Sequence, residues 1–348
     1  MTVTIDKAMP FVSFGIAPTP EYIDGSFTVN ASSDSSEPIR YEYVSGPCAE
    51  ADVTTGDFSI LAAGDCDVRA YVVENMNYYG TDDTQTVTIA HSDATVTISI
   101  PLPTPTYLGG NFSVGATTTS DSAIDFSVDS GPCDVVDAGT GEFSTTGGGT
   151  CVISATVAET AGFNEASDSA SITVAPASTS IDFDTPLPTP TYLGGNFTAT
   201  ASTISDGAVT YSVDSGPCAV VDAVAGTFSS SGAGECVVRA SAAATENFEE
   251  TSNTASITIT RATGSITFDA PLPTPTYLDG DFSATATTTT DGTITYSVDS
   301  GPCAVTNADA GVFSSSGGGT CVVRATAAAT PDFESVDNPA SVPLAPSD

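Results

Sequence analysis

The feature that most constrains this 348-residue chain is an internal repeat with a constant period of 85 residues. The motif Ser-Gly-Pro-Cys occurs four times at this period, and seventeen residues separate each motif cysteine from a second cysteine. The eight cysteines are Cys48, Cys66, Cys133, Cys151, Cys218, Cys236, Cys303 and Cys321. Because a constant period marks repeated structural units, the chain is predicted to contain four domains, residues 1–91, 92–176, 177–261 and 262–348.

Each repeat has the pattern of half-buried β-strands rather than of helices. In the third repeat, apolar residues alternate with Thr, Ser and Asp along short runs, which are separated by Gly, Pro, Asp and Ser. The residues predicted to face the core are Phe197, Ala199, Ala201, Val209, Tyr211, Val213, Val238, Ala240, Ala242, Ile257 and Ile259. About seven strands per repeat fit an immunoglobulin-like (Ig-like) antiparallel β-sandwich. We therefore predict an all-β chain of four tandem Ig-like sandwiches in an elongated rod.

The cysteines are predicted to form one disulfide within each repeat. No pair has the Cys-x-x-Cys form or the histidine partners of a zinc site, and the chain has a single histidine. In the third repeat, Cys236 has the strand parity of Val238, so its sulfur is expected in the core within reach of Cys218. The same register applies to the other repeats. Disulfides persist in oxidising surroundings, which favours a location outside the cell.

The charge of the chain excludes several classes of partner. There are 43 acidic residues against six Lys plus Arg, which gives a formal net charge of -37. Such a surface repels nucleic-acid phosphates and anionic lipid. No apolar stretch reaches the length of about eighteen residues that a transmembrane helix needs. We expect neither nucleic-acid binding nor membrane insertion, and the acidic surface either keeps the chain soluble, suits a salty habitat or collects divalent cations.

No residue pattern indicates catalysis, and we predict that the chain is not an enzyme. His91 lies between the first two repeats and has no counterpart in the others, so we interpret it as a solvated linker residue. No cofactor is predicted, although calcium is considered because carboxylates are its usual ligands. None of the candidate carboxylates lies in an EF-hand pattern, and we interpret them as surface charges. They are Asp182, Asp184, Glu246, Glu249, Glu250, Asp279 and Asp281.

Other polar and aromatic residues are weaker candidates for a site. Asn30, Asn111 and Asn196 fit the N-glycosylation sequon. Tyr78 and Tyr79 form a local aromatic pair that could contact a sugar. Tyr79 has no aromatic counterpart and is expected to be exposed. Tyr78 is expected in the core, because it aligns with aromatic residues in every other repeat, namely Phe163, Phe248 and Phe333.

Both ends of the sequence have features that bear on assembly. Pro343 lacks the N–H that an interior strand needs, so the last strand is predicted to lie on a sheet edge and to protect that end. Residues 2–5 (TVTI) resemble the last strand of a repeat, and their pairing with the open sheet of another chain would build a filament. The first residues also lack the layout of a secretory signal.

The third repeat resembles a known family. The segments Val209–Cys218 (VTYSVDSGPC), Ala225–Phe228 (AGTF) and 234–242 (GECVVRASA) are similar to the bacterial immunoglobulin-like repeats of large surface proteins and adhesins. The resemblance extends over all four repeats. It implies a sandwich that serves as a spacer, a stalk or an adhesive module, and it carries over no catalytic or binding residue.

We therefore expect a non-catalytic structural or adhesive protein, an extracellular or cell-surface stalk or filament segment that spaces or attaches a surface. The expected partners are protein or glycan surfaces, or further copies that associate into fibres. Two alternatives stay open. One is a phage virion protein that decorates a capsid or tail, which agrees with the missing signal, and the other is a calcium-stiffened, ligand-binding adhesin.

Overall fold

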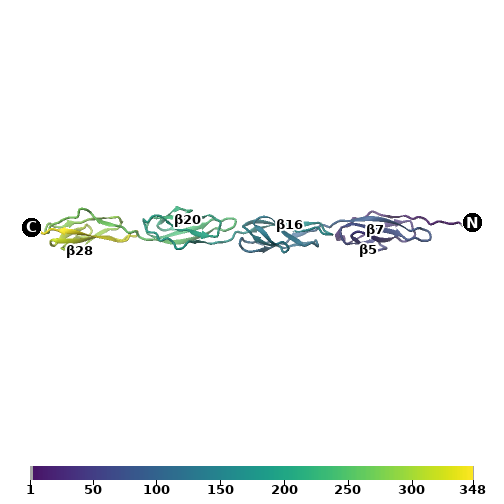
Figure 1. The fold of residues 1–348 in the computed structure, drawn as a ribbon, viewed down its shortest axis with the longest axis horizontal. Helices are drawn as coiled ribbons and strands as arrows, with labels where there is room; N and C mark the ends of the chain where they lie inside the picture. The colour runs from purple at the N-terminus through teal and green to yellow at the C-terminus, as the bar shows by residue number, and fades with distance from the viewer. Residues whose placement is uncertain (1–2, 348) are drawn as a thin grey trace. The chain divides into compact units, whose positions relative to one another are not determined.

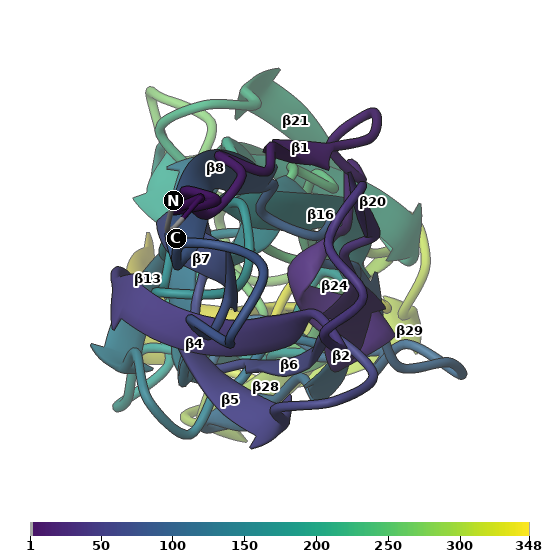
Figure 2. The same ribbon diagram turned by 90° about the vertical axis from the view of Figure 1, so that its right-hand side faces the viewer.

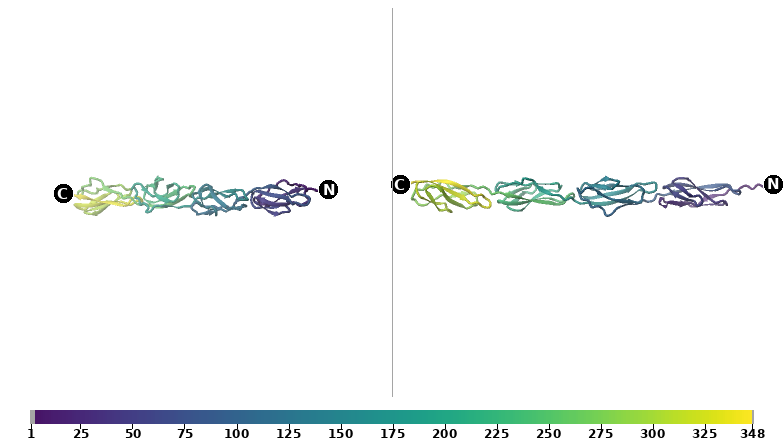
Figure 3. Two further views of the ribbon diagram at one scale, coloured as in Figure 1. Left: turned by 45° about the vertical axis from the view of Figure 1, so that its right-hand side comes forward. Right: turned by 90° about the horizontal axis from the view of Figure 1, so that it is seen from below.

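The structure is a computed structural model that describes residues 3–347. This part of the chain folds into β-strands from end to end (Figures 1 and 3). The one helix among these residues is the short 3₁₀-helix η1 (Tyr22–Asp24), and none is long and apolar enough to cross a membrane. The chain divides into two compact units, Met1–Ala177 and Ser178–Asp348, and each unit contains two repeats. The predicted all-β class is confirmed.

Every repeat contributes eight strands in the same order. Repeat 1 has β1 (Val12–Phe14), β2 (Ser26–Thr28), β3 (Ala31–Ser33), β4 (Arg40–Ser45), β5 (Cys48–Asp52), β6 (Asp57–Ile60), β7 (Gly64–Val72) and β8 (Thr81–Ile89). Repeat 2 has β9 (Val96–Ile98), β10 (Phe112–Ser113), β11 (Ala116–Thr118), β12 (Ile124–Ser130), β13 (Cys133–Asp137), β14 (Glu142–Thr145), β15 (Gly149–Val157) and β16 (Ala166–Val174). Repeat 3 has β17 (Ile181–Phe183), β18 (Phe197–Thr198), β19 (Ala201–Thr203), β20 (Val209–Ser215), β21 (Cys218–Asp222), β22 (Thr227–Ser230), β23 (Gly234–Ala242) and β24 (Thr251–Ile259). Repeat 4 has β25 (Ile266–Phe268), β26 (Phe282–Ser283), β27 (Ala286–Thr288), β28 (Ile294–Ser300), β29 (Cys303–Asn307), β30 (Val312–Ser315), β31 (Gly319–Ala327) and β32 (Val336–Leu344).

The strand order within each repeat is that of an Ig-like sandwich. In repeat 1, one sheet has the order β4-β7-β8, and the opposite layer consists of β2-β6-β5 and the pair β1-β3. All of these pairs are antiparallel. Figure 2 shows β2, β5 and β6 of this repeat below β7 and β8. These two layers correspond to the C-F-G and A-B-E-D sheets of a constant-type Ig domain.

The structure has eight strands per repeat rather than about seven because strand B is interrupted. In repeat 1 its halves are β2 and β3, and two residues, Val29 and Asn30, lie between them. The first half pairs with β6 and the second half pairs with β1. The side chain of Val29 is buried at this break. Strand B is therefore shared between two neighbours, so that a single strand holds the A-B-E-D layer together.

The core of each repeat follows from the alternation along its strands. In β23, Cys236, Val238, Ala240 and Ala242 are fully buried, and the residues between them are partly exposed. Every residue predicted to face the core of repeat 3 is buried or half-buried, which confirms the predicted parity. Phe228 lies at the centre of this core and stacks on Phe197 with ring centroids 5.7 Å apart. Aromatic pairs at this distance stabilise a core beyond the area that they bury.

A buried tyrosine satisfies the backbone where strand B is interrupted. In repeat 3, the N–H of Ala201, which begins β19, donates to the hydroxyl oxygen of Tyr211 at 2.7 Å. The equivalent hydrogen bonds occur in repeats 1 and 4, with Tyr41 and Tyr296 as acceptors. Repeat 2 has Phe126 at this position and therefore lacks the hydroxyl. The four repeats thus contain a natural comparison of Tyr with Phe at one site.

We expect Tyr211→Phe to lower the free energy of unfolding of repeat 3 by about 1 kcal/mol, because the half-buried N–H of Ala201 loses its acceptor. Hydrogen exchange measured by mass spectrometry should show faster exchange in peptides that cover β19 and β20. Repeat 4, which keeps Tyr296, is the internal control. Phe126→Tyr in repeat 2 should act in the opposite direction, and unchanged exchange in both variants would contradict the assigned role.

Candidate functional site

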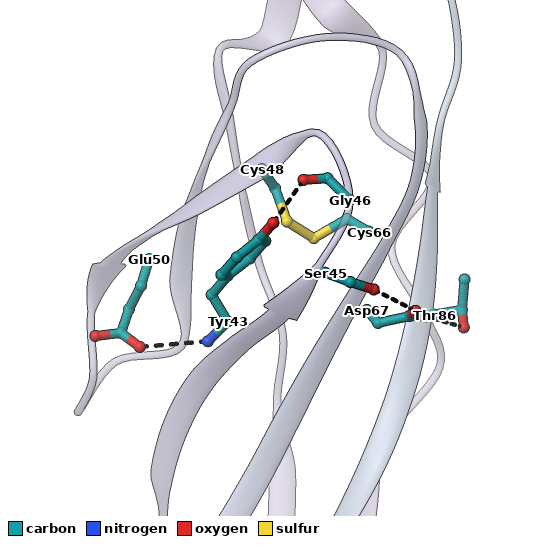
Figure 4. The surroundings of a disulfide bond; sticks show 8 residues. All are labelled: Tyr43, Ser45, Gly46, Cys48, Glu50, Cys66, Asp67 and Thr86. Carbon is teal, nitrogen blue, oxygen red and sulfur yellow. Dashed lines mark hydrogen bonds between the residues drawn. A yellow bond between two sulfur atoms is a disulfide. The ribbon is translucent and has the colours of Figure 1, made fainter.

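One disulfide joins the two sheets of each repeat, and Figure 4 shows that of repeat 1. In repeat 1 it connects Cys48, at the start of β5, to Cys66 in β7, with Cα atoms 5.9 Å apart. The other three disulfides have the same sequence separation of 18 residues. In antibody domains the disulfide joins strands B and F, whereas here it joins strands D and F. Each disulfide therefore closes a short loop that includes strand E.

The residues around the disulfide explain why the Ser-Gly-Pro-Cys motif contains a glycine. Gly46 has φ of +102°, and a Cβ at this position would lie 2.1 Å from the carbonyl oxygen of Asp65. A side chain would therefore separate the turn from the strand that carries Cys66. Tyr43 covers the turn by donating its hydroxyl hydrogen to the carbonyl oxygen of Gly46 at 3.0 Å (Figure 4). Glycine is thus required for the two sheets to approach closely enough for the disulfide.

Removal of one disulfide should destabilise one repeat selectively. The double variant Cys218→Ala and Cys236→Ala is expected to lower the stability of repeat 3 by about 3 kcal/mol, because the unfolded chain regains the entropy of an open loop. Hydrogen exchange resolved by peptide would measure the loss, with the three unchanged repeats as controls. Equal protection of repeat 3 in both proteins would show that the core alone stabilises the fold.

Paired charges lie on the outer face of the C-F-G sheet in repeats 3 and 4. Arg239 in β23 donates to both carboxylate oxygens of Asp214 in β20, at 3.0 and 2.6 Å. This hydrogen bonding, with the positive charge of Arg239, lowers the pKa of Asp214 below its ordinary value. Arg324 lowers the pKa of Asp299 in repeat 4 in the same way. Repeat 2 has no such arginine, because Ser154 stands at this position.

Arg239→Gln should raise the pKa of Asp214 towards the ordinary value of about 3.9, while the pKa of Asp299 stays low and serves as the control. Because the folded-state pKa is lowered, the pair contributes stability above the ordinary Asp pKa and loses it as the pH falls through the lowered value. Carboxyl titration followed by NMR would measure both groups. A titration of Asp214 that does not respond to the substitution would contradict the assigned cause.

The carboxylates considered for calcium are not brought together. Among residues 3–347, no group of three or more His, Cys, Asp or Glu side chains is placed to hold a metal ion. Asp184 accepts a hydrogen bond from Thr200 at 2.6 Å, Asp182 accepts one from Ser180 at 3.3 Å, and Asp281 accepts one from Thr306 at 3.2 Å. These carboxylates therefore bind hydroxyl groups of nearby residues.

The sequon asparagines lie on the surface. Asn30, Asn111 and Asn196 are all exposed, and the amide of Asn111 donates to Glu142 at 3.0 Å. Their position leaves the side chains accessible, and glycosylation stays a prediction.

The junction between repeats 1 and 2 forms a further set of contacts outside the cores. In the first unit, the ring of Tyr22 in η1 packs edge-on against Phe163, with centroids 5.4 Å apart. Phe163 lies in the loop between strands F and G of repeat 2, which we call the FG loop. A Cβ on Gly162 in this loop would lie 2.3 Å from the ring of Tyr22. The FG loop of repeat 2 is therefore seated closely on the end of repeat 1.

The chain that links repeats 1 and 2 is fixed by hydrogen bonds. Ser92 is only 2% exposed, and its hydroxyl oxygen accepts the N–H of Ile23 at 2.9 Å. Its own N–H donates to the carbonyl oxygen of Gly162 at 2.9 Å. The N–H of Ala63, in the loop between strands E and F, donates to Ala161 at 2.7 Å. The link is thus part of the folded structure.

The second unit contains the same junction with different residues. Tyr192 packs edge-on against Phe333 with centroids 5.6 Å apart. Ala262 takes the place of Ser92, and its N–H donates to the carbonyl oxygen of Asp332 at 2.9 Å. The N–H of Ala233 donates to the carboxylate of Asp332 at 2.7 Å. The aromatic pair and the bridged link are therefore common to both junctions.

The structure corrects two sequence-based expectations about aromatic residues. Phe163 and Phe333 do not belong to the cores of their own repeats, because their rings contact a tyrosine of the preceding repeat. Tyr78 is only half-buried. His91 lies in the link between β8 and β9 as predicted, with its side chain 35% exposed and its Nε2 3.5 Å from the carboxylate of Glu159. The expectation for Tyr79 is confirmed, because it is 42% exposed.

The strand edges agree in part with the sequence. β32, which contains Pro343, pairs only with β31 and is an edge strand as predicted. The corresponding strands β8, β16 and β24 are also edges, so the edge position is not particular to the fourth repeat. Of the segment 2–5, Thr2 lies outside the described residues. The other three residues are exposed and form no strand.

Similarity to known proteins is found among solved structures. No known protein-family model matches it, and no curated protein sequence matches it. Among solved structures, the ICAM-5 D1–D4 ectodomain fragment is 11% identical, with 96% of this chain and 99% of that chain covered and a TM-score of 0.36. The N-terminal eight Ig domains of the Down syndrome cell adhesion molecule are 10% identical, with coverages of 97% and 49% and a TM-score of 0.32. Drosophila N-cadherin EC1-3 is 14% identical, with coverages of 66% and 91% and a TM-score of 0.25.

At such TM-scores the whole chains do not superpose closely, so the fold assignment rests on the strand pairing of this chain. The C-F-G and A-B-E-D sheet orders, the shared strand B and the buried disulfide define it as a tandem array of Ig-like β-sandwiches.

Proposed function

We propose that this chain is a non-catalytic structural or adhesive protein that acts outside the cell as a stalk or filament segment. The observation that carries the proposal is the junction within each unit. Its link residues are hydrogen-bonded, and its Tyr–Phe pairs have centroids 5.4 and 5.6 Å apart. A flexible polar tether would let neighbouring domains move independently. A spacer or attachment protein instead needs contacts that resist such motion.

The chemistry of the repeats supports an oxidising environment. Every described cysteine is in a disulfide, and disulfides persist in secreted proteins, at cell surfaces and on virions. The formal charge of -37 disfavours anionic lipid and nucleic acid as partners and leaves protein surfaces, glycans or further copies of the chain. The similarity of its motifs to bacterial Ig-like repeats supports a cell surface, and a phage virion is the alternative location.

The proposal is tested in the native source by surface labelling and by attachment. Antibody added to intact cells or virions should label the protein. Whether cells or virions are labelled decides between the two locations. Replacement of the chain by the double variant Tyr22→Ala and Tyr192→Ala should reduce the attachment of the cells or virions that carry it. The reason is that both junctions lose an aromatic contact. Tyr22→Phe with Tyr192→Phe keeps both rings and is the matched control. An intracellular protein with free thiols, or attachment that does not depend on the junctions, would contradict the proposal.

A further inference from the structure

We propose that copies of this chain associate head to tail, with the FG loop of repeat 1 in one copy seated on the end of repeat 4 in another. The occupant of each end is thus a second copy of the chain. The contact would repeat, between molecules, the junction that joins neighbouring repeats within each unit. It differs from pairing of the TVTI segment with a sheet edge, because it uses a loop and a tyrosine-bearing end.

The end of repeat 4 has the tyrosine side of a junction, which is the side that contacts an FG loop. Tyr277 occupies the position of Tyr192, and its N–H donates to Ala345 at 2.8 Å as that of Tyr192 donates to Thr260 at 2.9 Å. The next residue, Leu278, has φ of 78° and is 72% exposed. Within the described residues, no ring contact is found for Tyr277, whereas Tyr192 packs on Phe333. Tyr277 therefore has the backbone arrangement of Tyr192 and presents its ring in the same way.

The FG loop of repeat 1 has the other side of a junction, which is the loop that contacts the tyrosine. Asn75 donates its N–H to Tyr78 at 3.0 Å, as Thr330 donates to Phe333 at 3.0 Å in repeat 4. The side-chain oxygen of Asn75 accepts the N–H of Tyr78 at 2.8 Å, as that of Thr330 accepts the N–H of Phe333 at 3.1 Å. The two loops are thus folded alike, with an aromatic ring at the same position.

The segment that precedes the first strand is also held against the FG loop in the same way in repeats 1 and 4. Ala8 forms a parallel bridge with Tyr78, as Ala262 does with Phe333. The N–H of Ala8 donates to the carbonyl oxygen of Asn77 at 2.8 Å, and the N–H of Ala262 donates to that of Asp332 at 2.9 Å. Repeat 1 therefore presents its loop with the support that the loop of repeat 4 has at an established junction.

The residues of the two ends fit one another. Asn77 has the shape of Asp332, whose side-chain oxygen accepts the N–H of Ala233, and Gly318 stands at the position of Ala233 in repeat 4. Asn77 supplies the same acceptor oxygen without a charge, which avoids repulsion between two acidic surfaces. Met76, next to it, is 90% exposed and adds apolar area to the contact.

The geometry implies an open chain rather than a closed dimer. The two surfaces are different, and a heterologous contact that does not close adds copies without limit. The covalent link raises the effective concentration at the internal junctions, so the contact between molecules is weaker and depends on concentration. Because every copy has a net charge of -37, added salt should favour association by screening repulsion.

Sedimentation velocity of the 348-residue chain, over a concentration series at low and high salt, tests the proposal. The weight-average sedimentation coefficient should rise with concentration, rise further at high salt and show no limit at the dimer. Tyr277→Ala and Tyr78→Ala should each raise the dissociation constant by about tenfold through loss of the aromatic contact. Tyr277→Phe keeps the ring and should associate like the unchanged chain.

A photoreactive benzoylphenylalanine in place of Tyr277 locates the contact. The cross-linked peptide should contain residues 75–79 of a second copy. A chain that stays monomeric at all concentrations and salt levels, a species that stops at the dimer, or cross-links only outside this loop would overturn the proposal. A monomeric chain that still labels and attaches its native surface would leave the proposed function standing.

Discussion

The close approach of strands D and F is the constraint on which each repeat depends. Gly46 lets the turn touch the backbone that carries Cys66, and the disulfide then holds the two sheets together. A domain of this size buries limited apolar area, and its core contains several alanines, such as Ala240 and Ala242. The cross-link restricts the unfolded chain and so adds stability that a small core would not supply. The rest of the sandwich is arranged around this contact.

The junctions within the two units also depend on a small number of residues. Each uses one tyrosine, one phenylalanine and a link of a few residues, and the link lies within a hydrogen-bonded bridge. The contact is apolar in a chain that is otherwise strongly acidic. Charge repulsion between neighbouring repeats is therefore opposed locally by burial of aromatic rings, and the acidic residues remain in solvent.

The differences between expectation and structure have physical causes. Strand B is interrupted because it pairs with two different neighbours, and a pattern of alternating residues cannot reveal a change of partner. Phe163 has the spacing of a core residue, yet its ring packs on Tyr22 from another repeat. The core of a repeat and a junction between repeats both remove an aromatic ring from water. Expected burial alone therefore did not distinguish the two environments.

The sequence by itself determined the features that depend on local periodicity and on exact repetition. These are the β class, the parity of strands such as β23, the four-fold repeat and the reach of Cys236 towards Cys218. Side chains alternate along any extended strand, so these properties need no knowledge of what lies opposite. Only the tertiary structure decided which strands are neighbours, why Gly46 is required and what the recurring tyrosines contact. Those properties depend on pairs of surfaces that meet after folding, and residues distant in sequence supply the two sides.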